Sequence, residues 1–206
     1  MNLIIKYFPG INETQTRQFQ QLLKAVPELN RKVNIISRKD MDHLEERHLL
    51  HSLAIACKFP FPPGTSVMDV GTGGGFPGIP LAVMFPEVRF ILVDSIGKKI
   101  RIVEQLARTL DLENVSTIAG RMEKLDLKVD FVVSRAVSSF PKLHGWTWKL
   151  INPGRLFDMP NGLISLKGGD LSAELGDFGK RVKQFSIARW FEEPFFSTKK
   201  IVYLEK

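Results

Sequence analysis

The sequence has very little cysteine and no long hydrophobic run. Cys57 is the one cysteine among 206 residues, so an internal disulfide is excluded, and this usage is typical of a reducing compartment. The apolar runs are far shorter than the roughly 20 residues that a membrane-spanning helix needs. The first residues carry no signal-peptide pattern. The sequence therefore predicts a cytoplasmic protein without a membrane partner.

Repeats, low-complexity tracts and a basic tail are also missing. The chain has 29 Lys and Arg against 22 Asp and Glu, a net charge of +7, and the basic excess is spread along its length. Such a charge permits contact with nucleic acid but does not establish it. A chain of this length supports one sizeable core. We expect a single domain over residues 1–206, a monomer, and no bound metal.

The most informative segment is residues 67–78, Val-Met-Asp-Val-Gly-Thr-Gly-Gly-Gly-Phe-Pro-Gly. A short apolar run, a glycine loop and an apolar helix-like segment follow one another there. Glycine lets backbone N–H groups approach a ligand closely, because no Cβ is in the way. The start of a helix adds unpaired N–H donors and a partial positive charge. The segment therefore predicts a loop that holds a nucleotide-like ligand.

Two ligands compete for this loop. Gly73, Gly75 and Gly78 satisfy G-x-G-x-x-G literally, which indicates a dinucleotide such as NAD. Asp69, however, lies just before the loop, where its charge would repel a pyrophosphate, and Asp94 ends the next apolar run, where it can accept both ribose hydroxyls. S-adenosylmethionine has no phosphate and carries a cationic sulfonium and ammonium, so acidic residues suit it better. Both alternatives stay open, since Asp69 can also be a turn-capping carboxylate.

Strands and helices alternate after the proline-rich residues 60–64. We expect strands at 66–70, 88–93, 115–119, 129–134 and about 163–167, and helices at 77–85, 97–110 and 140–150 with a short turn near 121–125. This alternation indicates a parallel sheet with helices on both faces. Two more strand-like runs, 182–190 and 199–205, can form an antiparallel edge pair. The predicted fold is α/β, a Rossmann-like class I methyltransferase arrangement with a mostly parallel seven-stranded sheet.

Residues 1–60 are predicted to form an N-terminal helical extension of the α/β core at 64–206. Helical spacing over 13–25 precedes Pro27, which we expect to break or redirect that helix. A second helix is expected from about Asp40 to Lys58.

Motifs along nearly the whole chain match one family. They are Val33–Ser37, Arg47-His48 with Ser52, Asp69–Leu81, Asp94-Ser95 with Lys98-Lys99, Ser134–Ala136 and Leu166–Gly169. Together they closely resemble the small-subunit ribosomal RNA methyltransferase G family, once called glucose-inhibited division protein B. The resemblance implies methylation of N7 of a guanine in the 530 loop of bacterial 16S rRNA, with S-adenosylmethionine as cofactor and the rRNA or small ribosomal subunit as partner. An NAD-type oxidoreductase and a non-catalytic RNA-binding assembly protein on the same scaffold remain the alternatives.

The resemblance also assigns residues to the cofactor. It implies contacts at Gly71, Phe76, Met122, Glu123 and Arg135, with Asp94 on the ribose; the loop argument adds Asp69, Gly73 and Gly75. Two features depart from the family pattern. His51 stands where many members carry Asp, and residues 152–162 look longer than usual.

The implied chemistry needs little from the protein. Guanine N7 has an in-plane lone pair that is unprotonated at neutral pH, so we expect catalysis by placement and no general base. Arg135 and Lys167 are the predicted catalytic positioning residues, directed at O6 because N7 must stay free. Basic residues ahead of and on the N-terminal helices are the predicted RNA contacts, with a solvated helix face as the alternative. They are Arg38, Lys39, Arg47 and His48.

Overall fold

The computed structural model describes residues 1–156 and 159–206, apart from the side chain of Arg38. Phe157 and Asp158, inside the predicted 152–162 insertion, therefore lie outside the described residues, as does the Arg38 side chain that was predicted to contact RNA. On either side of that gap, β5 (Arg155–Leu156) and β6 (Met159–Pro160) pair as a small antiparallel ribbon.

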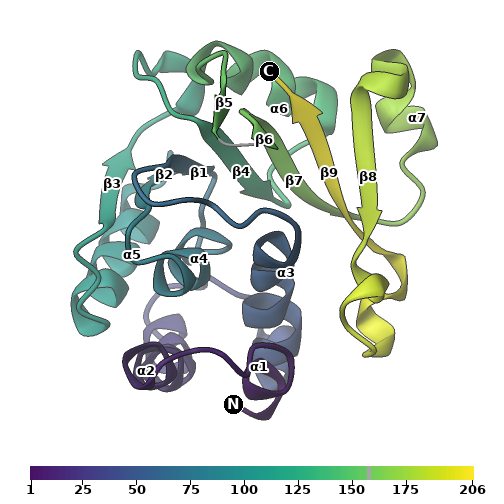
Figure 1. Cartoon of the computed structure of the whole chain (residues 1–206). Coiled ribbons are helices and arrows are strands. Elements are labelled where there is room, and N and C mark those ends of the chain that lie inside the picture. Colours follow the sequence, from purple (N-terminus) through teal and green to yellow (C-terminus); the bar gives the residue numbers. More distant parts are fainter. Residues whose placement is uncertain (157–158) are drawn as a thin grey trace.

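A seven-stranded sheet forms the centre of the molecule (Figure 1). Its strands are β1 (Ser66–Val70), β2 (Arg89–Asp94), β3 (Val115–Ala119), β4 (Phe131–Arg135), β7 (Gly162–Gly168), β8 (Val182–Ser186) and β9 (Lys199–Glu205). The order is β3-β2-β1-β4-β7-β9-β8; the first five strands are parallel, and β9 runs antiparallel to both β7 and β8. The predicted mostly parallel Rossmann-like sheet is confirmed.

The last two strands differ in detail from the prediction. They form an antiparallel pair, but β9 lies inside the sheet between β7 and β8, so only β8 is at the edge. The predicted run 182–190 ends as a strand at Ser186, because Ile187–Arg189 form the 3₁₀ turn η6. Ile187 is fully buried on the side of the sheet that faces the N-terminal helices, which explains the turn toward that core.

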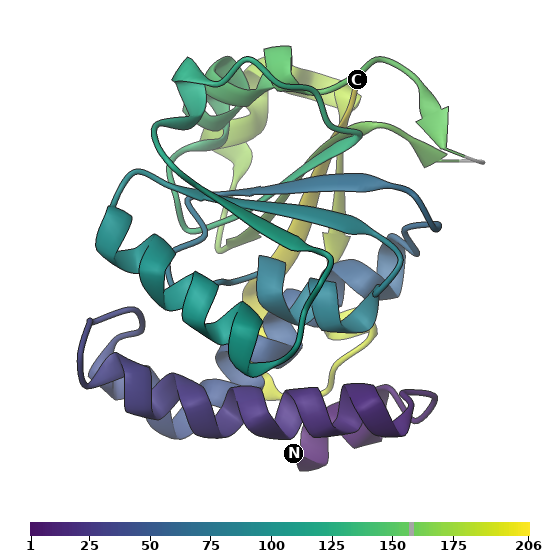
Figure 2. The same cartoon turned by 90° about the vertical axis from the view of Figure 1, so that its left-hand side faces the viewer.

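Helices cover both faces of the sheet, as Figures 1 and 2 show. Their bounds are α1 (Asn2–Tyr7), α2 (Glu13–Asn30), α3 (His51–Lys58), α4 (Gly78–Met84), α5 (Gly97–Thr109), α6 (Phe140–Thr147) and α7 (Ser172–Leu175). Alternate strand residues separate two cores, because side chains of a strand point to opposite faces. Val67 and Phe131 pack with α2 to α5, whereas Met68 and Val132 pack with α6 and α7.

The prediction that Pro27 breaks the first long helix is wrong. Helix α2 continues through Pro27 to Asn30, and Figure 2 shows it as one long helix along the bottom of the molecule, beneath α5. Proline removes one backbone hydrogen bond of the helix. The apolar stripe of α2 outweighs that loss, since Val26 and Leu29 on either side of the proline remain buried against the core.

The second predicted helix is helical throughout but has three successive geometries. The 3₁₀ turn η1 (Arg38–His43) leads into the π-helix η2 (Glu45–Leu50), which continues as α3. Single π-turns occur frequently at functional sites, because the wider turn redirects side chains. Arg47 and His48, both predicted to contact RNA, lie within this π-turn.

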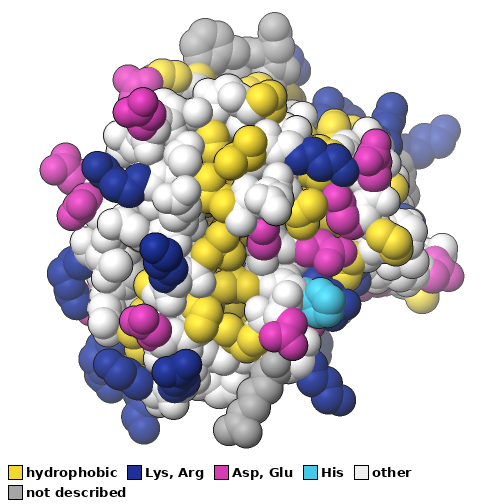
Figure 3. Space-filling model, turned by 90° about the horizontal axis from the view of Figure 1, so that it is seen from below, with side chains coloured by type: hydrophobic (Ala, Val, Ile, Leu, Met, Phe, Trp, Pro, Cys, Tyr) yellow, Lys and Arg dark blue, Asp and Glu magenta, His cyan; other side chains and the backbone are white. Residues whose placement is uncertain are grey.

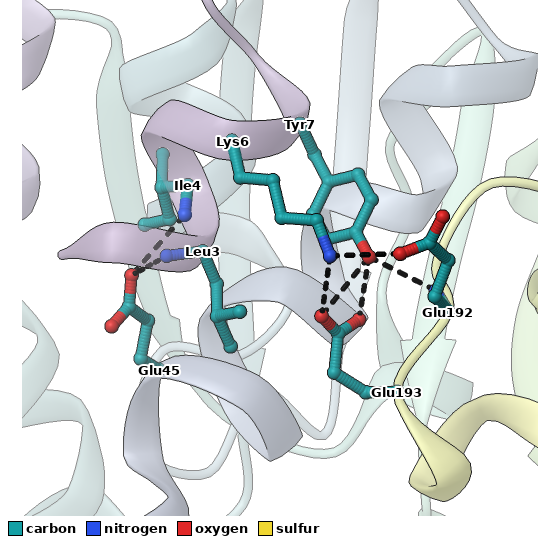
Figure 4. A network of polar contacts seen from close by, with 7 residues as sticks. All are labelled: Leu3, Ile4, Lys6, Tyr7, Glu45, Glu192 and Glu193. Atoms are coloured by element: carbon teal, nitrogen blue, oxygen red, sulfur yellow. Dashed lines mark hydrogen bonds and ion pairs between the residues drawn. The ribbon is translucent and has the colours of Figure 1, made fainter.

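The short helix α1 ties the π-turn to the C-terminal part of the chain (Figure 4). Glu45 accepts hydrogen bonds from the backbone N–H groups of Leu3 and Ile4 at 2.8 and 3.2 Å, and so caps the start of α1. At the other end, the Tyr7 hydroxyl lies 3.0 Å from the Glu193 carboxylate. Glu193 directly precedes the 3₁₀ helix η7 (Pro194–Thr198). The N-terminal helix therefore braces two segments that line the site described below.

The face on the α1 and α2 side carries mixed charge. Viewed from below, Lys and Arg side chains are interspersed with Asp and Glu around a band of hydrophobic side chains (Figure 3). Ile5 of α1 is one of the exposed large hydrophobic residues. No helix of the described residues is long and apolar enough to span a membrane.

Candidate active site

The glycine loop follows β1 and is shaped by close packing. A Cβ on Gly71 would lie 2.5 Å from Val137, and one on Gly75 would lie 2.7 Å from Ile79, so the protein itself requires glycine at both positions. Gly73 differs, because a Cβ there would meet only the Gly71 carbonyl oxygen, at 3.9 Å. Its backbone has φ +60°, and Gly73 is not in the lining of either cavity described below, so its predicted contact with the cofactor remains a prediction, as do those of Gly75 and Phe76.

Asp69 lies beneath this loop. Its Oδ2 accepts hydrogen bonds from the Thr72 hydroxyl at 2.6 Å and from the Gly78 backbone N–H at 2.8 Å. The side chain is fully buried, and this burial raises the pKa of the carboxyl to about 7. Asp69 is absent from the lining of the cavity described next, so it holds the loop in shape; its predicted direct contact with the cofactor remains a prediction.

Asp94 stands at the carboxyl end of β2, where the sequence placed it. Its Oδ2 accepts the Gly73 N–H at 3.0 Å and its Oδ1 accepts the Ile96 N–H at 2.9 Å. Each oxygen has a further lone pair. The carboxylate lines a cavity of about 420 Å³. It is therefore held in place by the backbone and able to accept hydrogen bonds from a ligand.

The lining of this first cavity includes four predicted cofactor residues, Gly71, Asp94, Met122 and Glu123. It also includes residues that the sequence argument did not assign to the cofactor, among them Ser95, Ile96, Lys99, Val137 and Trp146. Position after a strand end is the signal that could have found Ser95 and Val137. The Gly71 backbone, a fixed carboxylate and a cavity beyond the strand ends fit a nucleoside-containing ligand such as S-adenosylmethionine.

Arg135, at the end of β4, connects the sheet to the N-terminal helices. Its Nη1 donates to the Arg47 carbonyl at 3.1 Å, and its Nη2 lies 2.8 Å from Nδ1 of His48. The guanidinium carbon is 5.2 Å from the ring centroid of Phe76 in the glycine loop. Burial lowers the pKa of Arg135 to about 10, so it remains charged. Arg135, His48 and Phe76, predicted separately, form one cluster.

The contact with Arg135 determines the state of His48. A guanidinium only donates, so Nδ1 of His48 accepts and the ring proton is on Nε2. Burial, reinforced by the positive charge of Arg135, lowers the pKa of His48 to about 3. The ring is therefore neutral and presents an N–H donor. It has no free lone pair with which to act as a base.

Lys167 is held in the wall of the site. Its Nζ donates to the Ser138 carbonyl at 2.5 Å and to Oε1 of Glu174 at 2.7 Å. The ammonium thus links β7 to α7 and keeps one N–H for a further partner. Lys39 is exposed on η1 and is not among the residues that line the cavity described next.

A second cavity, of about 340 Å³, adjoins the first. Its wall combines the π-turn with the ends of β4 and β7, and includes Asp40, Arg47, His48, His51, Arg135, Lys167, Phe195 and Lys199. Ala136 lines both cavities. It has φ +56°, a left-handed conformation that costs a non-glycine residue about 1–2 kcal/mol. Within the described residues there is no cluster of acidic, histidine or cysteine side chains suited to a metal.

Two buried neutral histidines, His48 and His51, predict acid destabilisation. Burial lowers both pKa values far below that of the unfolded chain, so only the unfolded state gains protons as the pH falls through 6.5. Well below that pH, each histidine should lower the free energy of unfolding by about 1.4 kcal/mol per pH unit. Asp69 acts in the opposite direction, because its raised pKa gives stability that is lost as the pH rises from about 4 through 7.

Urea unfolding of the wild type and of His51→Gln between pH 4.5 and 7.5 isolates the histidine contribution. Well below pH 6.5, the slope of the unfolding free energy against pH should be smaller in the variant by about 1.4 kcal/mol per pH unit, the contribution of one proton. Equal slopes in the wild type and His51→Gln would contradict a neutral buried His51.

Comparisons with known proteins agree on one family. The family model described as GidB, rRNA small subunit methyltransferase G, matches residues 15–184. A curated relative from Bacteroides thetaiotaomicron, named Ribosomal RNA small subunit methyltransferase G, is 50% identical over 203 residues, which cover 98% of each chain. A relative of the same name from Cytophaga hutchinsonii is 46% identical over 204 residues, which cover 99% of each chain.

Solved structures agree on the fold. A SAM-dependent methyltransferase from Aquifex aeolicus superposes with a TM-score of 0.58 at 17% identity, covering 82% of this chain and 98% of that one. A SAM-dependent O-methyltransferase from Thermotoga maritima gives 0.55 at 14% identity, covering 75% and 64%. At these identities the likeness concerns the fold alone.

Proposed function

Because the chain belongs to the rRNA small subunit methyltransferase G family, we propose that it methylates N7 of a guanine in the 530 loop of bacterial 16S rRNA. The observation that carries this proposal is the pair of adjoining cavities that share Ala136. One has the features of a nucleoside site, and the other is lined by cationic and aromatic side chains suited to a base and its phosphates.

The first cavity is the proposed cofactor site. S-adenosylmethionine supplies an electrophilic methyl group when it is bound there. Asp94 would accept from the ribose hydroxyls, and the Gly71 backbone, which lines this cavity, would lie against the ligand. Glu123 would accept from the adenine amino group. Val137 fixes the loop by packing on Gly71, so the shape of this site depends on the end of β4 as well as on β1.

The second cavity is the proposed acceptor site. Guanine N7 needs no deprotonation, and the groups around the cavity agree with this, since His48 is neutral and protonated on Nε2. Arg135 is placed by two contacts to the π-turn and one to Phe76. We therefore propose that Arg135 and Lys167 position the base and its flanking phosphates, and that catalysis comes from orientation.

The RNA would approach the open side of the second cavity. Lys39 on η1 is exposed, and Lys199 lies at the cavity. The mixed charge of the α1 and α2 face (Figure 3) favours contact near η1 and the strand ends over contact with that face. We further propose that the 1–60 extension and the 64–206 core act as one domain, in a cytoplasmic monomer.

The rate of methyl transfer should vary little with pH. In single turnover at saturating RNA, the rate should stay nearly constant from mildly acidic to mildly basic conditions, because neither N7 nor His48 changes protonation in that range. Asp69, whose pKa is about 7, is the group whose titration can disturb the loop. The profile should therefore be measured in the wild type and in Asp69→Asn. An ionisation near neutrality that persists in both would indicate a general base and contradict the mechanism.

Calorimetry with S-adenosylhomocysteine and with NAD separates the proposed function from the dinucleotide alternative. We expect saturable binding of S-adenosylhomocysteine and none of NAD, because Asp69 and Asp94 place negative charge around the loop. Binding of NAD alone would reject the proposal. An assembly protein without activity is excluded if the purified chain methylates small-subunit rRNA.

A further inference from the structure

Two short, irregular helical segments form part of the wall of the second cavity. The π-turn η2 contributes Arg47 and His48, and the 3₁₀ helix η7 contributes Phe195. A 3₁₀ helix has poorer hydrogen-bond geometry than an α-helix, and π-turns occur as single turns. The positions of both segments therefore depend on contacts with other parts of the chain. The segments meet at the cavity, where the guanidinium carbon of Arg47 lies 5.5 Å from the ring centroid of Phe195.

Helix α1 is tied to the π-turn through Glu45. This residue begins the turn and stands two positions before Arg47. Its Oε1 accepts hydrogen bonds from the backbone N–H groups of Leu3 and Ile4 at 2.8 and 3.2 Å, and its Oε2 lies 3.1 Å from the amino group of Met1. The carboxylate is held against the start of α1 by these contacts, so α1 and the π-turn are expected to move together.

The same helix is tied to η7 through Glu193, which stands two positions before Phe195. The Tyr7 hydroxyl lies 3.0 Å from each oxygen of the Glu193 carboxylate and accepts the Glu192 backbone N–H at 3.0 Å (Figure 4). Nζ of Lys6 lies 3.4 Å from the same carboxylate. The Glu193 side chain is only 16% exposed, and a carboxylate removed from water is costly unless it has such partners. Helix α1 supplies them.

We propose that Glu45 and Tyr7 are positioning residues for methyl transfer, because through α1 they set the distance between the π-turn and η7. That distance determines where Arg47 and Phe195 stand at the acceptor. The inference rests on the proposed function and adds to it two residues that line neither cavity. Since the wall that they hold belongs to the second cavity, the RNA step should depend on them and cofactor binding should not.

Single-turnover methylation of small-subunit rRNA at saturating RNA tests the inference. Tyr7→Phe removes the hydroxyl but keeps the ring, which packs 4.8 Å from the ring of Phe191. Glu45→Ala removes the acceptor at the other end of α1. Each should lower the rate by about 5- to 50-fold, because a displacement of about 1 Å costs roughly 100-fold and the remaining contacts limit the shift. The affinity for S-adenosylhomocysteine, measured by calorimetry, should equal that of the wild type.

Three further variants separate positioning from loss of stability. Glu45→Gln keeps a side-chain carbonyl that can accept from the backbone of α1, so it should recover most of the rate. Val88→Ala, at a buried residue outside both cavity walls, should lower the free energy of unfolding and leave the rate unchanged. Ile5→Ala, at a residue of α1 that is 50% exposed, controls for a change in the helix itself and should also react at the wild-type rate.

The double variant of Tyr7→Phe and Glu45→Ala tests whether the two residues act through one helix. Each single change releases one end of the same connection, so the double variant should react about as slowly as the slower single variant. Independent effects would multiply. A rate equal to the product of the two losses would therefore contradict a shared action through α1.

The outcomes distinguish this inference from the function on which it rests. If the wild type does not methylate the RNA, the proposed function itself is rejected. If the wild type is active and both single variants react at its rate, the positioning role is rejected and the function stands. A loss of rate matched by an equal loss of affinity for S-adenosylhomocysteine would also overturn the inference, since it would show a general loosening. Should Glu45→Ala fail to fold, Tyr7→Phe decides the question alone.

Discussion

Replacing Arg135 by Ala should lower the single-turnover rate of methyl transfer by about 100-fold or more, which is the scale of loss when reacting groups are misplaced by about 1 Å. The guanidinium connects the end of β4 to the Arg47 carbonyl, to His48 and to the Phe76 ring. Its loss frees the π-turn from the sheet at the point where the two cavities meet. Donor and acceptor would then no longer be held in line.

Arg135→Lys separates charge from geometry in this experiment. Lysine keeps the positive charge but cannot make two diverging contacts from one planar group, so the rate should recover only in part. Arg101→Ala, at an exposed arginine of α5, is the control and should react at the wild-type rate. A folded Arg135→Ala protein with near-normal turnover would remove Arg135 from the mechanism.

Replacing Asp94 by Ala should weaken binding of S-adenosylhomocysteine by about 1–3 kcal/mol, roughly 5- to 150-fold, because ribose hydroxyls and two backbone N–H groups would lose their acceptor. Those N–H groups belong to Gly73 and Ile96, so the loop and the start of the cavity wall both lose a fixed point. Titration calorimetry measures the effect directly.

Asp126→Ala is the matched control for this measurement. Asp126 is exposed and does not line the first cavity, so its removal should leave the affinity unchanged. If Asp94→Ala binds S-adenosylhomocysteine as tightly as the wild type, the ribose is held elsewhere and the proposed orientation of the cofactor is wrong.

The sequence predicted best the features that depend on short stretches of chain, namely those indicated by hydrophobic periodicity and by the positions of glycines. The strand–loop–helix around Gly73 and the carboxylate that ends β2 follow from short-range patterns, and both are confirmed as structure. The prediction failed at Pro27, because the local cost of proline was judged without the tertiary burial of Val26 and Leu29 that offsets it.

The contacts that build the second cavity could not be predicted from spacing. Arg135 meets the Arg47 carbonyl across 88 residues of sequence, and nothing local indicates that a π-turn would present it. His51 was noticed only as a departure from a family pattern; its burial and unpartnered Nε2 appear only once α3 is packed against the strand ends. The position of Asp69 just before the glycine loop led to the prediction that it contacts the ligand. In the structure its carboxylate accepts hydrogen bonds from Thr72 and Gly78 and so holds the loop in shape.

Mapping the methyl group on the RNA tests the central claim most directly. The purified protein would be incubated with S-adenosylmethionine and small-subunit rRNA from a strain that lacks the enzyme, followed by borohydride reduction and aniline cleavage, which cut at N7-methylguanosine. The account predicts one new cleavage, at a guanine in the 530 loop, that is lost with Arg135→Ala. Methylation of another atom or another region, or no methylation by a protein that binds S-adenosylhomocysteine normally, would contradict it.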